Sequence, residues 1–500
     1  MTIIFIFSSL FPLVIFVYFY FHSKYNYWRT RGIPCVPGII PVFGHMWSLV
    51  SLKESFPTLC ERIYQKYENS SMVGFYQFKT PTLLIRDSEL AKLILVTNFS
   101  NFGENQILLD PHLDPSMSKN PFFARMEDWK IVRSVMTTGF SSSKLKSLFL
   151  STRDVSFKLR KFLVTQIDRR GKEVELVEFW NRYTGEFVAH VGFGLEGHCF
   201  ESDDNFERII SVMFGSSILA RTKEMLSFYS PGLAKLLRIR RVPKKLELFF
   251  RDSIKDVLKK RNSQEHYDDF LQMMIEHQKT HGDCKINEKN LLIYMEGFLL
   301  DAYESASISL SFLCLQLALY PKIQDKVRQE IVVNLQKYDN QLCYELLNDL
   351  NYMEQVLYES LRMNATIPLL SKRCIEECEI SAKDGLSCKI SPGVIVLISL
   401  YGLHMDPKYW PNPEMFDPER FSEREKEKRS SKFTFLPFGQ GPRMCVGRRM
   451  AMIEMKLALI QLLLNCSLEI SSKTDLPIKR DLHFSTTPKS GLWVRLKLLS

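Results

Sequence analysis

A single long apolar stretch, residues 287–319, constrains the fold of this chain more than any other feature. Tyr320 and Pro321 end the stretch, and a proline fits the first turn of a following helix. A helix that is apolar almost all round is buried on every side. The stretch therefore predicts one long helix in the core of a folded domain.

Helical periodicity dominates the rest of the chain. Helices are predicted at residues 56–67, 145–167, 244–262 and 450–464, and short strands at residues 73–77, 82–85, 394–399 and 492–498. No long linker, repeat or low-complexity segment separates these elements. The sequence therefore predicts one mainly α-helical domain with a small β subdomain.

The N-terminus has the properties of a membrane anchor. Residues 3–21 are almost all apolar or aromatic, and as a helix they would span roughly 28 Å, enough to cross a bilayer core. Lys24, Arg29 and Arg31 follow, and basic flanks stay on the cytosolic side. We expect a signal anchor at residues 1–23, with the body of the protein in the cytosol.

A basic, proline-rich hinge is expected at residues 24–45, because closely spaced prolines stiffen a linker and block helix continuation. The folded catalytic domain is then expected at residues 46–500. Tyr25, Tyr27 and Trp28 are expected at the membrane interface, where amphipathic rings gather.

Charge and cysteine content limit the class of partner and the compartment. The net charge of +10 favours an acidic protein partner or an anionic membrane surface, and no basic run interleaved with aromatic residues suggests nucleic-acid binding. Eleven cysteines occur without any CxxC pair, which argues against a disulfide framework and for a reducing compartment.

One cysteine stands in a glycine-containing loop that ends at a predicted helix. The loop contains Phe438, Gly441, Arg443, Cys445 and Gly447. Glycines allow backbone N–H groups to approach the sulfur, and the positive end of the following helix favours a thiolate. Such a thiolate can be the axial ligand of a haem iron, whereas an isolated buried cysteine is usually inert.

The loop resembles the haem-ligand loop of the cytochrome P450 superfamily, Phe-x-x-Gly-x-Arg-x-Cys-x-Gly. The resemblance extends from the anchor to the C-terminal strand and is strongest to insect detoxification and vertebrate drug-metabolising enzymes. It implies the cytochrome P450 fold, a haem b whose iron is ligated by Cys445, and insertion of one oxygen atom from dioxygen into a lipophilic small molecule. It also implies NADPH electrons delivered by NADPH–cytochrome P450 reductase, and an endoplasmic reticulum membrane location.

A second motif of the family is structural. Glu359 and Arg362 are three residues apart on a predicted helix, so they share a face. With Arg420 they resemble the Glu-x-x-Arg motif and its partner arginine, a triad that fixes the segment leading to the cysteine loop.

Haem propionates need charged or bidentate donors. Trp129 and Arg133 are one helical turn apart and resemble the propionate-binding helix of the family. Arg443 and Arg373 match further propionate donors, and Phe438 belongs to the cofactor loop. The alternative for any single arginine is a solvated surface residue.

The long helix carries polar residues where the family activates oxygen. Glu304 and Ser305 match the acid and alcohol that deliver protons, although the family usually has threonine in place of this serine. Ala302 replaces a glycine close to the haem, and Asp301 replaces an alanine. Asp301 is interpreted as a neutral acid or a local ion pair, as a residue that recognises a cation, or as a group esterified to a haem methyl.

Two surface regions are predicted to bind partners. Residues 228–250 mix leucines with basic residues, so they are expected either in the membrane interface or as a solvated loop. A basic face for an acidic flavoprotein is expected around the cysteine loop, and it comprises Lys426, Lys428, Arg429, Lys432, Arg448 and Arg449. A reductase-independent isomerase and a silent haem carrier remain as alternative functions, and no motif identifies the substrate.

Overall fold

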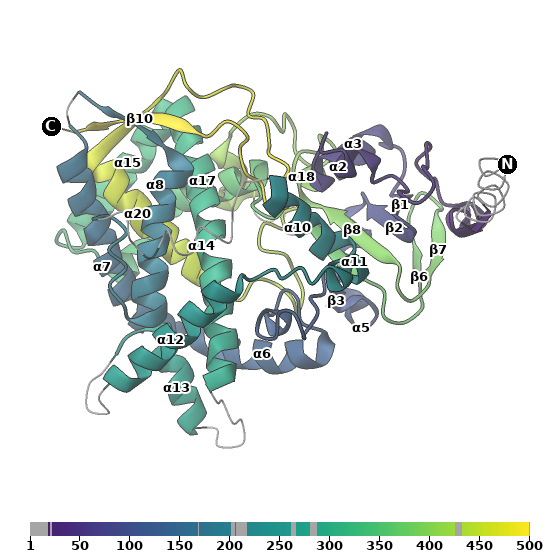
Figure 1. Ribbon diagram of the computed structural model, residues 1–500. Helices are drawn as coiled ribbons and strands as arrows, with labels where there is room; N and C mark the ends of the chain where they lie inside the picture. Colours follow the sequence, from purple (N-terminus) through teal and green to yellow (C-terminus); the bar gives the residue numbers. More distant parts are fainter. Residues whose placement is uncertain are drawn as a thin grey trace, which may run out of the picture.

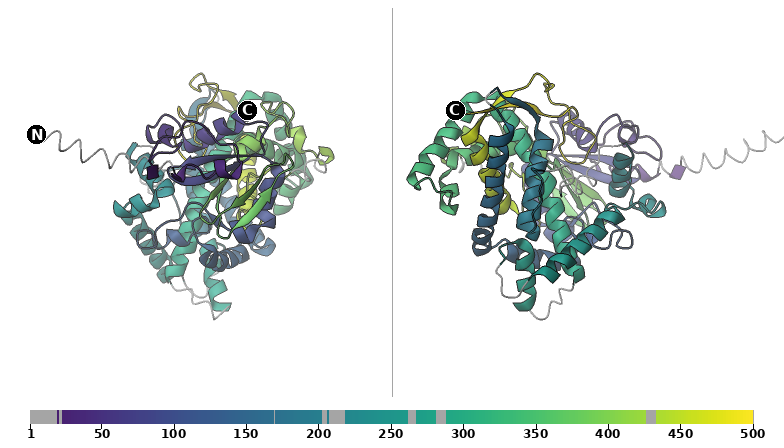
Figure 2. Two further views of the ribbon diagram at one scale, coloured as in Figure 1. Left: turned by 90° about the vertical axis from the view of Figure 1, so that its right-hand side faces the viewer. Right: turned by 60° about the vertical axis from the view of Figure 1, so that its left-hand side comes forward.

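The computed structural model describes residues 19–20, 23–168, 170–201, 206, 218–261, 267–280, 288–425 and 433–499. Most of the predicted anchor, residues 1–23, lies outside these residues. Figure 1 shows a large helical body, with the strands β1, β2, β6 and β7 on the side where the chain begins. The right-hand view of Figure 2 shows the same division, with the purple N-terminal segment on one side of the helical body.

Helix α14, Glu288–Leu319, runs through the middle of the helical body, as the apolar stretch predicts (Figure 1). It packs against α8, Leu176–Phe187, α17, Asn351–Met363, and α20, Arg448–Asn465. Residues Lys289–Leu319 form the single helix of the described chain that is long and apolar enough to cross a membrane. Because 72% of its most apolar window is buried inside the protein, we interpret it as a core helix.

The other predicted helices are confirmed within a few residues. Pro321 occupies the first turn of α15, Pro321–Lys337, so it begins a helix rather than interrupting one. The remaining helices of six or more residues are α3 Phe56–Lys66, α6 Met126–Gly139, α7 Ser142–Gln166, α10 Ile218–Tyr229, α11 Pro231–Leu236, α12 Lys244–Lys260, α13 Phe270–Thr280 and α16 Tyr344–Asp349.

The strands form three small sheets, and all four predicted strands are present. The five-stranded sheet has the order β1-β2-β8-β5-β3, in which only β2 and β8 are parallel. A three-stranded sheet has the order β4-β10-β9, and β6 pairs with β7. The bounds are β1 Met72–Gln77, β2 Thr80–Ile85, β3 Glu104–Asn105, β4 Lys172–Glu175, β5 Leu369–Arg373, β6 Cys378–Ser381, β7 Ser387–Ile390, β8 Ile395–Ser399, β9 Cys466–Ile470 and β10 Trp493–Leu498.

The expectation that Trp28 lies at the membrane interface is wrong. Its side chain is fully buried, and its indole Nε1–H donates to the Phe75 carbonyl at 3.0 Å. A Cβ at Gly74 would lie 2.3 Å from the Trp28 ring, so the glycine leaves room for the indole on β1. The hinge is therefore anchored to the first sheet by its tryptophan.

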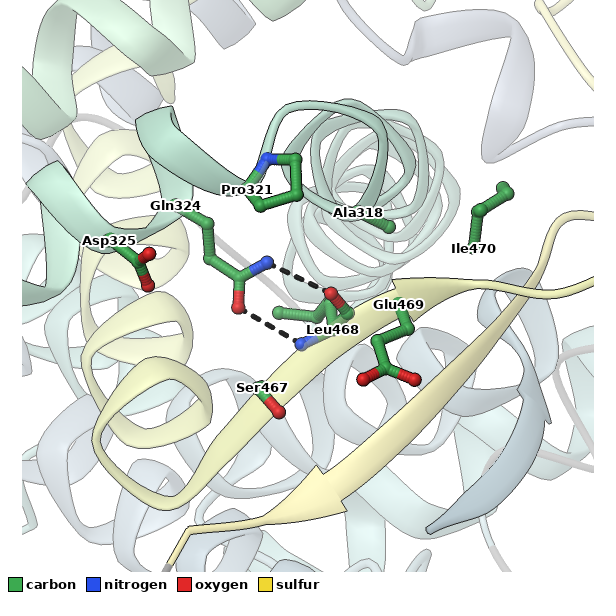
Figure 3. A pocket seen from close by; sticks show the side chains of 8 residues that line it. All are labelled: Ala318, Pro321, Gln324, Asp325, Ser467, Leu468, Glu469 and Ile470. Atoms are coloured by element: carbon green, nitrogen blue, oxygen red, sulfur yellow. Dashed lines mark hydrogen bonds between the residues drawn. The ribbon is translucent and has the colours of Figure 1, made fainter.

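A pocket of about 370 Å³ lies where α15 and β9 meet the end of α14 (Figure 3). Gln324 projects from α15 and forms two hydrogen bonds with the Leu468 backbone, one to the carbonyl and one from the N–H, each 3.0 Å long. Since none of the residues predicted to bind the cofactor lines this pocket, we interpret the contact as structural.

Candidate active site

The cysteine loop is a tight turn that leads into α20. The Cys445 N–H donates to the Phe438 carbonyl at 2.9 Å, and the Met444 N–H donates to the Gly441 carbonyl at 3.0 Å. Gly441 has a φ of +77°, and a Cβ there would lie 2.1 Å from the Leu95 carbonyl oxygen. Only glycine fits this position, so the local backbone requires the residue that the motif contains.

The Cys445 side chain is exposed although it lies deep in the protein, so it faces an interior space. Burial raises the pKa of the Cys445 thiol to about 11, while the backbone N–H groups of Gly447 and Arg448 and the nearby Arg133 lower it. The N–H groups at the start of α20 thus stabilise the thiolate, as the loop predicts. A metal ion bound to the sulfur would remove the thiol proton outright.

Trp129, Arg133 and Arg443 come together beside the loop, as the sequence predicts. The Arg133 Nη1 donates to the Met444 carbonyl at 2.6 Å. The Arg443 guanidinium lies 4.7 Å from the centre of the Trp129 ring. Arg443 also donates to two backbone carbonyls, those of Pro121 at 2.8 Å and Ala124 at 2.9 Å. The loop is therefore joined both to α6 and to the segment before it.

The structure adds a cation that the sequence analysis missed. On β5, Lys372 and Arg373 point to opposite faces because strand side chains alternate. Arg373 pairs across the sheet with Glu104, whereas the Lys372 Nζ donates to Asn105 at 2.7 Å and lies near Arg443. Burial, and secondarily Arg443, lowers the pKa of Lys372 to about 7. The alternation of side chains along β5 was the sequence signal that could have identified Lys372.

This donor set fits the two carboxylates of a haem. Several cations are half or fully buried here, and the nearby carboxylate that raises the pKa values of Arg373 and Arg443 is Glu104. The Nε atoms of Arg373 and Arg443 have no hydrogen-bond partner among the described residues. Buried cations with unused donors indicate a site for an anionic group.

Asp301, Ala302, Glu304 and Ser305 lie on α14, and Asp301 is close enough to Cys445 to raise the pKa of its thiol. The Ser305 Oγ donates to the Asp301 carbonyl at 2.5 Å, one turn back along the helix. Ala302 is half-buried and packs against the core. The helix therefore presents its polar residues across the interior space from the cysteine.

Glu304 belongs to a polar group that includes residues distant in sequence. The Ser485 hydroxyl donates to the Glu304 carboxylate at 3.1 Å. Burial and then Glu224 raise the pKa of Glu304 to about 6, while Arg241 and His483 lower it. His483 in turn lies 3.3 Å from Glu224. No local sequence signal marks these partners, because α10 and the C-terminal segment meet α14 only through the tertiary fold.

Glu359 and Arg362 are completely buried and form a bidentate pair, with Arg362 nitrogens 2.7 and 2.9 Å from the two carboxylate oxygens. The Arg420 Nε lies 3.3 Å from the Glu359 Oε1, so the predicted three residues meet. The Arg362 Nη1 also donates to the His404 carbonyl at 2.7 Å.

His404 connects Arg362 with the segment that leads to the cysteine loop. Its Nε2 accepts a hydrogen bond of 3.0 Å from the Leu436 N–H, two residues before Phe438. Burial, then Arg362, lowers the pKa of His404 to about 3, so the ring stays neutral and retains a lone pair for this bond.

The structure describes only two of the six residues of the predicted basic face, Arg448 and Arg449. Lys426, Lys428, Arg429 and Lys432 lie outside the described residues. The Arg448 guanidinium lies 5.9 Å from the centre of the Phe438 ring, and Arg449 donates to Ser142 at 2.9 Å. Arg449 is exposed at the start of α20, next to the cysteine loop.

Known proteins are similar to the chain along nearly its whole length. The family described as Cytochrome P450 matches residues 34–495. Cytochrome P450 9e2 of Blattella germanica is 30% identical, and the alignment covers 97% of this chain and 96% of that protein. Cytochrome P450 6d1 of Musca domestica is 30% identical, with 96% and 97% covered, and the probable cytochrome P450 6d4 of Drosophila melanogaster is 28% identical, with 97% and 96% covered.

Proposed function

Because this chain belongs to the cytochrome P450 family, whose members are monooxygenases, we propose that it is a haem-thiolate enzyme that oxidises a lipophilic small molecule. The observation that carries the proposal is the placement of Cys445 and the Asp301–Ser305 turn of α14 around one interior space. A thiolate on one side and a carboxyl–hydroxyl pair on the other are the protein groups that this chemistry needs.

Haem b, when bound, supplies the iron that activates dioxygen, with electrons from NADPH through a membrane flavoprotein reductase. Cys445 would ligate the haem iron through its thiolate, and Trp129, Arg133 and Arg443 would hold the propionates. Lys372 joins this set because its buried ammonium lies near Arg443 and, among the described residues, donates a hydrogen bond only to the Asn105 side chain. Arg373 remains a candidate, although its cross-strand neighbour is Glu104.

The triad of Glu359, Arg362 and Arg420 maintains the cysteine loop in position through His404. The buried pair is bidentate and fully hydrogen-bonded, so removal of one member leaves an uncompensated buried charge. We therefore assign these three residues a structural role.

Glu304 and Ser305 hold and pass protons. The pKa of about 6 keeps a fraction of the Glu304 carboxyl groups protonated near neutral pH, which suits a group that donates and then recovers a proton. The Ser305 hydroxyl, already bonded to the Asp301 carbonyl, retains lone pairs that accept from water or substrate. Ser485 fixes the Glu304 carboxylate by donating to it.

The body of the enzyme lies against the endoplasmic reticulum membrane on the cytosolic side, with residues 1–23 as its anchor. Exposed leucines support a second lipid contact, because Leu236 is 77% exposed and Leu233 and Leu237 are exposed beside Lys235 and Arg238. Arg448 and Arg449 belong to the face on which the acidic reductase binds.

Reconstitution with the reductase tests this function. We expect NADPH consumption and an oxidised product in the presence of a substrate, and Glu304→Gln should lower product formed per NADPH consumed. Product without NADPH would indicate a haem-thiolate isomerase, and haem binding without turnover of any substrate would indicate a silent haem carrier.

A further inference from the structure

Asp301 has no cationic partner in a site where other acids have one. Its side chain is exposed although it lies deep in the protein, so it faces the interior space. Burial raises the pKa of Asp301 to about 7, and the hydrogen bond from Asn120 lowers it. Among the described residues, no lysine, arginine or histidine forms an ion pair with it.

The neighbouring carboxylates differ in this respect. Arg241 and His483 lower the pKa of Glu304, and His483 lies 3.3 Å from Glu224. On the cysteine side, the cations have the propionates as their expected partners. Within the part of the chain that the structure describes, Asp301 is thus the carboxylate of this site that has no cationic side chain as a partner.

The position of the Asp301 carboxylate is fixed from one side only. The Asn120 Nδ2 is 3.5 Å from the Asp301 Oδ2. Asn120 is itself 1% exposed, and its Oδ1 accepts a hydrogen bond of 2.7 Å from the Phe122 N–H. The second carboxylate oxygen, Oδ1, has no hydrogen bond from any described residue and remains open to a ligand.

Aromatic rings form an apolar cluster in the segments that contact Asp301 and Glu304. Phe122 lies two residues after Asn120, and Phe484 precedes Ser485, which bonds to Glu304. The Phe122 and Phe484 ring centres are 6.3 Å apart, and Phe228 lies 5.6 Å from Phe484 and 6.3 Å from Phe123. Aromatic faces attract cations as well as apolar groups.

We propose that Asp301 is a specificity-determining residue that selects lipophilic amines carrying a positive charge on nitrogen. In this proposal the cluster of Phe122, Phe228 and Phe484 binds the apolar part of the substrate, and the Asp301 carboxylate binds the cationic nitrogen. This inference rests on the proposed function, since it assigns a substrate class to the same site.

A pair of probes that differ only in charge tests the inference. One is a phenylpropyl trimethylammonium ion, and the other is its neutral isostere with a tert-butyl group. The quaternary nitrogen has no lone pair and cannot ligate iron. Dissociation constants are measured with the haem-loaded enzyme from the change in the haem absorption spectrum. We expect the cation to bind about tenfold more tightly, which corresponds to about 1.4 kcal/mol.

Asp301→Asn should remove this preference and leave the affinity for the neutral probe within about twofold. Asp301→Ser provides a second uncharged variant with a smaller side chain. Glu296→Gln is the matched control, because it makes the same change on the same helix at a buried carboxyl that faces Glu247, Asp114 and Arg251 instead. The control should retain the full preference.

Equal affinities for the two probes in the unmodified enzyme would overturn the inference, as would an unchanged preference in both Asp301 variants. The carbon-monoxide spectrum of the same preparations separates this failure from failure of the proposed function. A preparation with an intact thiolate band and no charge preference refutes only the role of Asp301.

Discussion

At the scale of single residues, a buried ionisable group outside the catalytic centre makes the stability of the protein depend on pH. Glu296 lies on α14 and is 2% exposed, and the Ser116 side chain near its carboxyl lowers its pKa only in part. Burial, followed by the charges of Glu247 and Asp114, raises the pKa of Glu296 to about 7. The ionised form is therefore penalised in the folded protein.

Glu296→Gln should change how stability depends on pH. Because the folded-state pKa is raised, the Glu296 contribution is most favourable below the ordinary pKa of 4.5 and is lost as the pH rises through about 7. Urea unfolding should show the variant more stable than the parent by about 2 kcal/mol at pH 8 and unchanged at pH 5. An equal effect at both pH values would contradict this account.

Lys372 and Arg373 permit a comparison of adjacent residues on opposite faces of β5. Lys372→Met should accelerate haem transfer to apomyoglobin about tenfold, since a charge-assisted hydrogen bond contributes about 1.5 kcal/mol or more. Lys372→Arg should retain the haem, and Arg373→Gln should have a smaller effect. Faster haem loss from the Arg373 variant than from Lys372→Met would show that the propionate donor had been assigned to the wrong residue.

At the scale of elements, a few side chains join segments that are far apart in the sequence. Gln324 on α15 bonds both backbone groups of Leu468 on β9, and its Nε2 also donates to the Leu317 carbonyl at 3.0 Å. Gln324 is 2% exposed, so these bonds are shielded from water.

Gln324→Ala should lower the free energy of unfolding by about 2 kcal/mol, because it leaves buried backbone groups unsatisfied. Asp325→Asn is the neighbouring control, since the Asp325 side chain is 71% exposed and its ion pair with Arg328 should contribute little. Equal losses in the two variants, measured by urea unfolding, would refute a special role for Gln324.

Sequence patterns predict the elements better than their long-range contacts. The period of apolar residues was sufficient to predict α14, α3 and α7. The motif also indicated that Glu359, Arg362 and Arg420 meet in the fold. Local patterns did not indicate which neighbour of Glu304 would come from the C-terminal segment.

Two outcomes of local reasoning have physical causes. The motif pattern indicates Arg373 and not Lys372, because charge type does not reveal the two-residue alternation of a strand, in which adjacent side chains face opposite sides; the role of Arg373 stays a prediction. Trp28 was placed at the membrane because its aromatic neighbours and basic flank fit an interface, but β1 leaves space for the indole at Gly74.

At the scale of the whole molecule, we infer that the fold brings Cys445 to a haem as a thiolate. The loop geometry, the start of α20 and the buried cations beside them all support this one ligand.

The absorption spectrum of the reduced, carbon-monoxide-bound enzyme tests whether Cys445 ligates the haem iron. We expect the far-red-shifted band characteristic of thiolate ligation, and we expect Cys445→His to lose that band even where haem remains bound. A reduced, carbon-monoxide-bound enzyme that lacks this band, or a Cys445→His variant that keeps it, would contradict the account.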